Sequence, residues 1–216
     1  MNLLTSESNF SIKSSLETSG TVLLDYAQST FTLQEWKDLE AAISPKKLPY
    51  EQVHFGDVGE LEHLNVGRLI TDIDQPRSVN RKASLKVISI LNSEKMSNFY
   101  REITGLENIW IRRCQAHILQ KGCFIGYHTD TDSNPDYLVA IILQFSSNYE
   151  GGNYIVYNKQ GKRKAIKTHR FSMLINRCDL PHEVTQVDLG ERKTLAYFLS
   201  PYPGINRRQY LKDINV

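Results

Sequence analysis

The sequence of 216 residues lacks the features that mark several specialised classes of protein. It has only three cysteines, Cys114, Cys123 and Cys178, and this odd number at wide spacings argues against a disulfide framework or a zinc ribbon. No apolar run is long enough to span a membrane, and residues 1–8 lack the basic and then apolar pattern of a secretory signal. We therefore expect a soluble, cytoplasmic protein with no membrane partner.

Charge of one sign is also scarce, because the net charge is only +2. Such a balance does not imply a polyanionic partner such as nucleic acid. The remaining composition, 40% hydrophobic and 23% charged, is ordinary for a globular protein. The chain contains no repeat and no low-complexity tract, and its length suits a single domain with a real hydrophobic core.

The first half of the sequence predicts two amphipathic helices. One begins at the capping box Thr32-Leu33-Gln34-Glu35 and ends at Pro45, and the other covers Glu94–Thr104. Residues 83–91 are apolar, but their periodicity does not decide between helix and strand. Residues 45–82 carry turn signals and charges, and we expect them to be mostly irregular.

The second half has a different pattern, with short β-rich runs separated by Gly, Asn, Asp and Pro. Many short strands close together indicate a jelly roll or barrel, and the preceding helices are expected to pack outside it. We therefore predict a mainly β fold with flanking helices. The expected strands are Trp110–Leu119, Tyr137–Phe145, Asn153–Tyr157, Lys164–His169, Phe171–Ile175, Glu183–Val187 and Lys193–Leu199.

Four residues in this half predict oxygen chemistry. His128, Asp130 and His182 supply two imidazoles and one carboxylate, a facial set of three ligands suited to non-haem Fe(II). Three ligands on one octahedral face leave three positions open for substrates. Arg192 follows at a distance that lets it hold a dicarboxylic co-substrate by a two-pronged hydrogen bond.

The spacing of His128 and Asp130 is explained if both lie on one strand, because side chains two apart point to the same face. Zinc with a bound water is an alternative occupant for the same ligands, although a zinc hydrolase has no general need for Arg192. The run 130–134 also resembles the start of a calcium loop. That interpretation fails because Pro135 stands where the loop needs Gly and Ile141 where it needs its closing Glu.

The order of motifs over about residues 105–200 resembles the Fe(II)/2-oxoglutarate-dependent dioxygenases, most closely their prolyl-4-hydroxylase-like branch. A turn containing Gly122 precedes His-x-Asp, and a strand over 141–145 leads to Gly151-Gly152. Pro181-His182-Glu183-Val184 follows, and then Arg192-Lys193-Thr194. Agreement in both order and spacing makes the resemblance specific.

The resemblance implies a double-stranded β-helix that uses Fe(II), 2-oxoglutarate and O2, with ascorbate as an additional reductant. It implies iron ligation by His128, Asp130 and His182, and binding of the distal 2-oxoglutarate carboxylate by Arg192 with support from Thr194. The sequence departs from the family pattern where many relatives have a co-substrate tyrosine: Ile118 or Leu119 stands at one such place and Gln144 at another. Gln144 is therefore expected to donate a hydrogen bond to the co-substrate instead.

The implied activity is hydroxylation of an unactivated C–H bond in an amino acid, small metabolite or peptide residue, with release of succinate and CO2. Halogenating relatives lack the carboxylate that Asp130 supplies. The implied organisation is one domain over 1–216, with helical support and substrate-covering segments over 1–105, the β-helix over 106–200 and a tail over 201–216. Two alternatives are a nucleic-acid or protein demethylase of the same superfamily and a non-catalytic sensor or binding module.

Two further features bear on the demethylase alternative. Nucleic-acid demethylases often carry a second arginine six residues after the first, and Phe198 stands there. A basic stretch is interpreted as a solvated hairpin, since scattered charge is normal on exposed strands. Its residues are Lys159, Lys162, Arg163, Lys164, Lys167 and Arg170.

Overall fold

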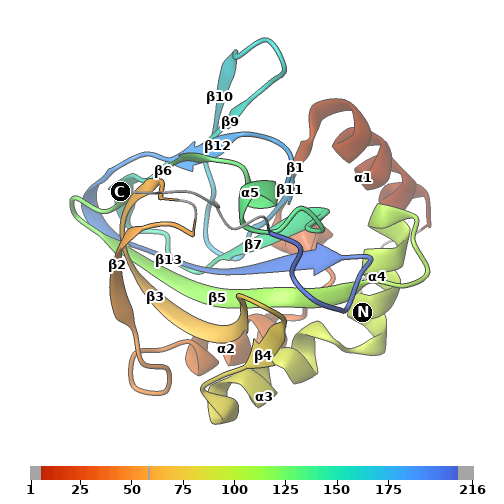
Figure 1. Ribbon diagram of the computed structural model, residues 1–216, viewed down its shortest axis with the longest axis horizontal. Helices are drawn as coiled ribbons and strands as arrows, with labels where there is room; N and C mark the ends of the chain where they lie inside the picture. Colours follow the sequence, from red (N-terminus) through yellow and green to blue (C-terminus); the bar gives the residue numbers. More distant parts are fainter. Residues whose placement is uncertain (1–5, 58, 209–216) are drawn as a thin grey trace, which may run out of the picture.

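The computed structural model describes residues 6–57 and 59–208, and its strands form one strongly curved antiparallel sheet (Figure 1). The strands are β1 (Thr21–Leu24), β2 (Glu51–Phe55), β3 (Leu61–Asp72), β4 (Pro76–Ser78), β5 (Trp110–Gln120), β6 (Phe124–His128), β7 (Val139–Gln144), β8 (Tyr149–Gly151), β9 (Tyr154–Tyr157), β10 (Arg163–Ile166), β11 (Met173–Arg177), β12 (His182–Val184) and β13 (Val187–Ser200). The helices are α1 (Ser6–Ser19), a short 3-10 turn over Tyr26–Gln28, α2 (Leu33–Ala42), α3 (Arg81–Leu91), α4 (Glu94–Thr104) and α5 (Asp130–Ser133).

The strand order folds this sheet into two facing layers. It runs β1-β11-β7-β13-β5-β3-β6-β12-β9-β10, with β2 and β4 added beside β3 and β8 beside β13. Strand β3 pairs with β5 in one layer and with β6 in the other, so it forms the bend between the two layers. This is the predicted jelly-roll architecture, a double-stranded β-helix.

Helices α2, α3 and α4 cover the outside of the layer that contains β13, β5 and β3 (Figure 1). The period of two along β13 explains how one strand serves two environments. Leu195, Tyr197 and Leu199 belong to the core beneath the helices, whereas Ala196 and Phe198 belong to the core between the layers. The space between the layers therefore has one wall backed by a rigid helix-covered sheet.

Both predicted helices are confirmed. The side chain of Thr32 accepts a hydrogen bond from the backbone N–H of Glu35, as the capping box requires, and α2 follows. Helix α4 covers Glu94–Thr104 and ends at Gly105, whose φ of 72° lies in the left-handed region that favours glycine. The apolar run over 83–91 is helical, within α3.

The expectation that residues 45–82 are irregular is wrong. The segment supplies β2, β3 and β4, and the 12-residue β3 is the strand that joins the two layers. Its apolar alternation is interrupted because Glu62 and Arg68 face a cavity between the layers and not the hydrophobic core. Charge in this strand therefore reflects a polar site, which local hydrophobic periodicity alone does not reveal.

The basic stretch lies at the β9–β10 hairpin and the chain that follows, and this hairpin projects from the body of the molecule (Figure 1). All six of its basic residues are exposed, as expected for a solvated hairpin. Within the described ranges, no helix has both the length and the apolar character needed to cross a bilayer. The predicted tail over 201–216 lies outside the described residues from 209 onward.

Candidate active site

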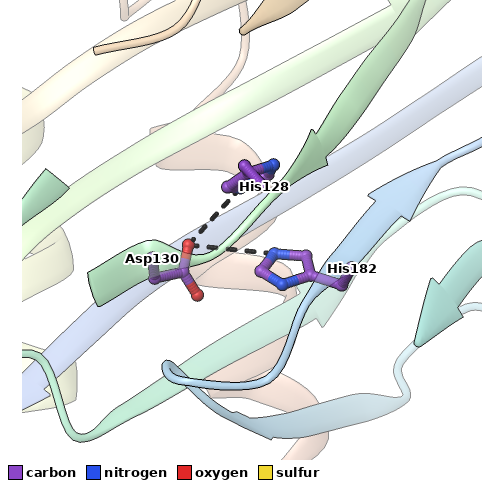
Figure 2. A group of neighbouring side chains, drawn as sticks. All are labelled: His128, Asp130 and His182. Atoms are coloured by element: carbon purple, nitrogen blue, oxygen red, sulfur yellow. Dashed lines mark ion pairs between the residues drawn. The ribbon is translucent and has the colours of Figure 1, made fainter. Parts of the chain in front are cut away.

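His128, Asp130 and His182 meet between the two layers (Figure 2). His128 ends β6, Asp130 begins α5, and His182 begins β12, where it is paired directly with His128. Asp130 Oδ1 lies 3.6 Å from His128 Nε2 and 3.8 Å from His182 Nε2. One donor atom from each residue lies within 4.8 Å of the others, so a single ion could contact all three.

The expectation that His128 and Asp130 lie on one strand is wrong. His128 and Asp130 do not share a strand face, because β6 ends at His128 and Asp130 is the first residue of α5. The turn between strand and helix, and not strand alternation, brings the carboxylate beside the imidazole. His182, by contrast, is the first residue of β12, one residue before the start of the predicted strand.

Backbone carbonyls fix the orientation of both imidazoles. His128 Nδ1 lies 2.8 Å from Gly126 O, and His182 Nδ1 lies 3.0 Å from Leu180 O. When each Nδ1 donates its proton to a carbonyl, the lone pair of Nε2 is free and points toward Asp130, an arrangement typical of metal-binding histidines. Gly126 is required here because a Cβ atom would lie 2.3 Å from Leu61 O.

The charges of the three groups are strongly coupled. Burial alone lowers the pKa of His128, but hydrogen bonding and attraction to Asp130 outweigh it and raise that pKa to about 9. Burial likewise opposes ionisation of Asp130, yet the two histidines hold its pKa below the ordinary value. Asp130 Oδ2 is buried and has no hydrogen-bond partner among the described residues. This donor set and its orphan oxygen fit a divalent cation such as Fe(II).

Arg192 lies in the same cavity, and its side chain is almost wholly buried at 1% exposure. Within the described part of the chain, its Nε and Nη2 atoms have no hydrogen-bond partner, and no carboxylate lies within ion-pair distance. Burial lowers the pKa of Arg192. A buried cation without an anion is costly, so the site is suited to an anionic ligand.

Two hydroxyl groups beside Arg192 are also buried without a partner in the described residues: Thr194 Oγ1 and the phenol oxygen of Tyr154. Thr194 lies two residues along β13 and lines the same cavity, as predicted. Tyr154, on β9, stacks on His182 with ring centroids 5.1 Å apart. Tyr154 lines the same cavity as Asp130 and Arg192, and burial together with the charge of Asp130 raises the pKa of its hydroxyl.

Sequence reasoning missed Tyr154. It lies three residues beyond the first glycine of Gly151-Gly152, a place where the sequence gives no chemical signal. Gln144, which was expected to contact the co-substrate, does not line the cavity. Its Nε2 donates to Ser146 O at 3.2 Å, and its Oε1 accepts from Thr168 Oγ1 at 3.1 Å. A direct contact between Gln144 and a co-substrate therefore stays a prediction that these contacts do not favour.

Known proteins that resemble this chain in sequence and in fold indicate the family to which it is related. The family model described as the 2OG-Fe(II) oxygenase superfamily matches residues 114–200, a stretch that contains the cluster of His128, Asp130 and His182 as well as Arg192 and Thr194. A crystal structure of an oxidoreductase of the 2OG-Fe(II) oxygenase family from Burkholderia pseudomallei is 29% identical, with a TM-score of 0.84, and the match covers 94% of each chain. Residues 114–200 therefore carry the pattern of the 2OG-Fe(II) oxygenase superfamily, and the fold of the chain is that of an oxygenase of this family.

More distant oxygenases share the fold. A prolyl hydroxylase from Trichoplax adhaerens, in complex with a peptide fragment of hypoxia inducible factor, is 16% identical with a TM-score of 0.62, covering 91% of this chain and 90% of that one. The epimerase SnoN, in complex with Fe3+, alpha ketoglutarate and nogalamycin RO, is 8% identical with a TM-score of 0.68, covering 90% and 84%. A search of curated protein sequences finds no match. Because the family model, the similar oxygenase structure and the His-Asp-His cluster agree, this protein is an enzyme that uses Fe(II), 2-oxoglutarate and O2.

The floor of the oxygenase cavity carries further polar residues from alternate positions of β5, which sequence reasoning did not assign to the site. Arg113 Nε donates to Gln115 Oε1 at 3.0 Å, and Gln115 Nε2 lies 2.8 Å from His117 Nε2. Burial and nearby arginines lower the pKa of His117 to about 3, so this imidazole is neutral. The apolar residues Ile142 and Val184 also line the cavity.

Proposed function

We propose that this oxygenase hydroxylates an unactivated C–H bond of an amino acid, small metabolite or peptide residue, with release of succinate and CO2. The single observation that carries the proposal is the complete His128, Asp130 and His182 cluster, whose free ligand atoms converge in a cavity that also contains Arg192. Because Cys114, Cys123 and Cys178 are all free, we further propose that the enzyme works in a reducing compartment such as the cytoplasm.

We assign iron ligation to the three clustered residues. The carbonyl contacts at Nδ1 of both histidines leave Nε2 available, and Asp130 offers an unpartnered oxygen. Iron with 2-oxoglutarate and O2 supplies the oxidant that inserts oxygen into the C–H bond. The contribution of the protein is to hold the ligands on one face and to leave the remaining positions accessible from the cavity.

We assign the distal carboxylate of 2-oxoglutarate to Arg192, Thr194 and Tyr154. The unpartnered atoms of these three residues are two guanidinium nitrogens and two hydroxyl groups, a donor set suited to one carboxylate. Burial excludes competing water, which strengthens each of these contacts. The phenol of Tyr154 thereby offers the hydroxyl that Ile118, Leu119 and Gln144 cannot supply.

Hydroxylation is favoured over halogenation because Asp130 provides a third protein ligand. An iron held by all three side chains would have no position left for chloride once 2-oxoglutarate and oxygen were also bound. The decisive measurement is the product mass under labelled oxygen with abundant chloride. Gain of one labelled oxygen atom and formation of one succinate per turnover support the proposal, whereas a chlorinated product or a loss of two hydrogens contradicts it.

The ligand assignment is tested by metal binding. His182→Ala and Asp130→Ala are expected to weaken Fe(II) binding severely, measured anaerobically by calorimetry, and to abolish formation of succinate. A matched control is His169→Ala, because that imidazole is half-exposed and pairs with Asp25 on the surface, with His169 Nε2 3.0 Å from Asp25 Oδ1. Unchanged iron affinity in His182→Ala would contradict the proposed site.

A further inference from the structure

The outer half of the cavity differs from the iron end because it holds charges of both signs. Arg113 rises from β5 on the floor, and Glu62 comes from β3 at the bend between the layers. Each affects the ionisation of the other, so they lie close enough to interact. No ion pair within 4.0 Å joins them in the described part of the chain. A gap therefore separates a cation and an anion that face the same space.

Arg113 is held in place with donor capacity left over. Its Nη1 pairs with Asp57, its Nε donates to Gln115, and its guanidinium lies 5.8 Å from the centre of the Phe198 ring. Its Nη2 makes no hydrogen bond to any described residue. A guanidinium fixed on two sides and open on a third can bind a ligand carboxylate with little loss of side-chain entropy.

The Glu62 carboxylate has no cation paired with it among the described residues. It forms no hydrogen bond or ion pair with the described residues, although it lines the cavity and is only partly exposed. Burial, reinforced by Glu60, raises its pKa to about 7. An ammonium group placed beside it would offset both effects, because an opposite charge favours the ionised carboxylate.

The size of the ligand is limited by the tip of the β2–β3 hairpin. Asp57, at this tip, pairs with Arg113 on the floor and lies 3.9 Å from Arg208 of the C-terminal segment. These contacts hold the hairpin across the cavity. The cavity lining also includes apolar side chains, among them Leu64 and Phe198. The space thus suits a compact molecule with separated charges better than an extended peptide.

We infer that the substrate is a free α-amino acid, or a close relative with both charges, whose carboxylate binds Arg113 and whose ammonium binds Glu62. This inference rests on the proposed function, since it names the substrate class of the same cavity. It makes Arg113 and Glu62 determinants of specificity that contact the substrate and not the iron.

The test begins with the wild-type enzyme loaded with Fe(II). Binding of 2-oxoglutarate is first measured under nitrogen, and its failure would count against the proposed function. The protein is then supplied with O2 and with each of the common L-amino acids, and products are analysed for a gain of one oxygen. Each amino acid is compared with its N-acetyl and its carboxamide derivative. We expect product from at least one free amino acid and at least tenfold lower kcat/KM for both blocked forms.

Variants then identify which residue binds the ammonium group of the substrate and which binds its carboxylate. Glu62→Gln is expected to lower kcat/KM for the free amino acid at least about tenfold while changing that for the N-acetyl form little. Arg113→Met is expected to lower kcat/KM for the free amino acid to a similar extent while changing that for the carboxamide form little. Asp57→Asn weakens the contact that holds the hairpin but keeps the Arg113 guanidinium, so it separates loss of the charge from loosening of the hairpin. Glu102→Gln and Arg77→Met, both at exposed positions, are matched charge controls.

The outcomes are distinct. Selective loss of the free amino acid in Glu62→Gln and Arg113→Met supports the inference. Binding of 2-oxoglutarate without oxidation of any free amino acid overturns the substrate class and leaves the proposed function intact. Equal or better turnover of the blocked forms also overturns it, as does an unchanged preference in both variants.

Discussion

Two arginines of this oxygenase are equally buried but have opposite surroundings. Arg112 on β5 has 0% exposure and Arg192 on β13 has 1%. Arg112 Nη2 pairs with Asp72 at 2.9 Å and its Nη1 donates to Tyr202 O at 2.7 Å. Arg192 has neither a carboxylate nor a carbonyl acceptor at its Nε and Nη2 atoms in the described residues. Burial therefore does not distinguish the two arginines, whereas the presence or absence of an ion-pair partner does.

The partners of Arg112 form a network that ties distant segments together. Asp72 at the end of β3 also accepts hydrogen bonds from Asn134 Nδ2 at 2.9 Å and from the Tyr137 hydroxyl at 3.0 Å. Asn206 donates to the backbone oxygen of Asp72 at 2.7 Å. The charges at this end are neutralised by the Arg112–Asp72 ion pair, although Arg112 Nε has no hydrogen-bond partner among the described residues. Arg192 has no carboxylate partner among the described residues, and under the proposed assignment the distal carboxylate of 2-oxoglutarate supplies the missing negative charge.

The largest expected effect is at Arg112. Arg112→Met leaves Asp72 buried without its cation, which typically costs about 3 to 5 kcal/mol of stability. The free energy of unfolding is measured by urea denaturation, with Arg192→Met as the matched variant. We expect Arg192→Met to be as stable as wild type or more stable, because it removes an unpaired buried charge. Equal destabilisation by both substitutions would contradict the distinction.

The second effect is on co-substrate binding. Removal of one partner from a buried charged contact commonly costs about 2 to 5 kcal/mol, so Arg192→Met should weaken 2-oxoglutarate binding at least about tenfold. Calorimetric titration of the Mn(II)-loaded protein measures this without turnover. Arg81→Met, at an exposed position, is the charge control. Wild-type affinity in Arg192→Met would show that the assignment is wrong.

A smaller effect is expected at Tyr154. Hydrogen bonds to charged groups are worth about 1.5 to 3 kcal/mol, so Tyr154→Phe should lower 2-oxoglutarate affinity by roughly tenfold or more. Stability should be unchanged, because the phenol hydroxyl has no protein partner among the described residues to lose. Tyr157→Phe is the control, since that hydroxyl bonds Glu183 outside the cavity. If Tyr154→Phe instead lowers stability with normal affinity, the hydroxyl is structural.

The sequence predicts those parts of the molecule that depend on local rules. The capping box at Thr32 and the glycine at position 105 determine helix ends by contacts a few residues apart. The jelly-roll fold follows from the β-rich runs, and the cluster of His128, Asp130 and His182 follows from residue types in a specific order. His128 and Asp130 were identified correctly as neighbours even though the strand geometry given as the reason was wrong.

The parts that could not be predicted depend on contacts between distant segments. Arg112 and Arg113 are adjacent, and only the assembled sheet shows that the first is in a structural network and the second in the cavity. The same holds for Tyr154, whose hydroxyl matters because of Arg192 on another strand. Strand β3 was not predicted because its charged residues line the cavity. Charged residues interrupt the apolar alternation from which a strand is predicted, so the segment resembles a loop.

The smallest expected effect is on the pH dependence of stability at Glu62, a charged group that has no ion-pair partner among the described residues and is less buried than the two arginines. Glu62 has a pKa raised to about 7 by burial and by Glu60. Its unfolded form releases the proton near pH 4.5, so between about pH 4.5 and 7 the folded state binds more protons and stability falls as pH rises. The full shift corresponds to about 3 kcal/mol, and screening at this partly exposed group reduces the expectation to about 1 kcal/mol. Glu62→Gln should flatten this part of the stability profile, measured by urea denaturation from pH 4.5 to 8, and Glu102→Gln should leave it unchanged. If the profile of Glu62→Gln matches wild type, Glu62 is already compensated in the folded protein and the contrast drawn from Arg112 and Arg192 applies only to fully buried charges.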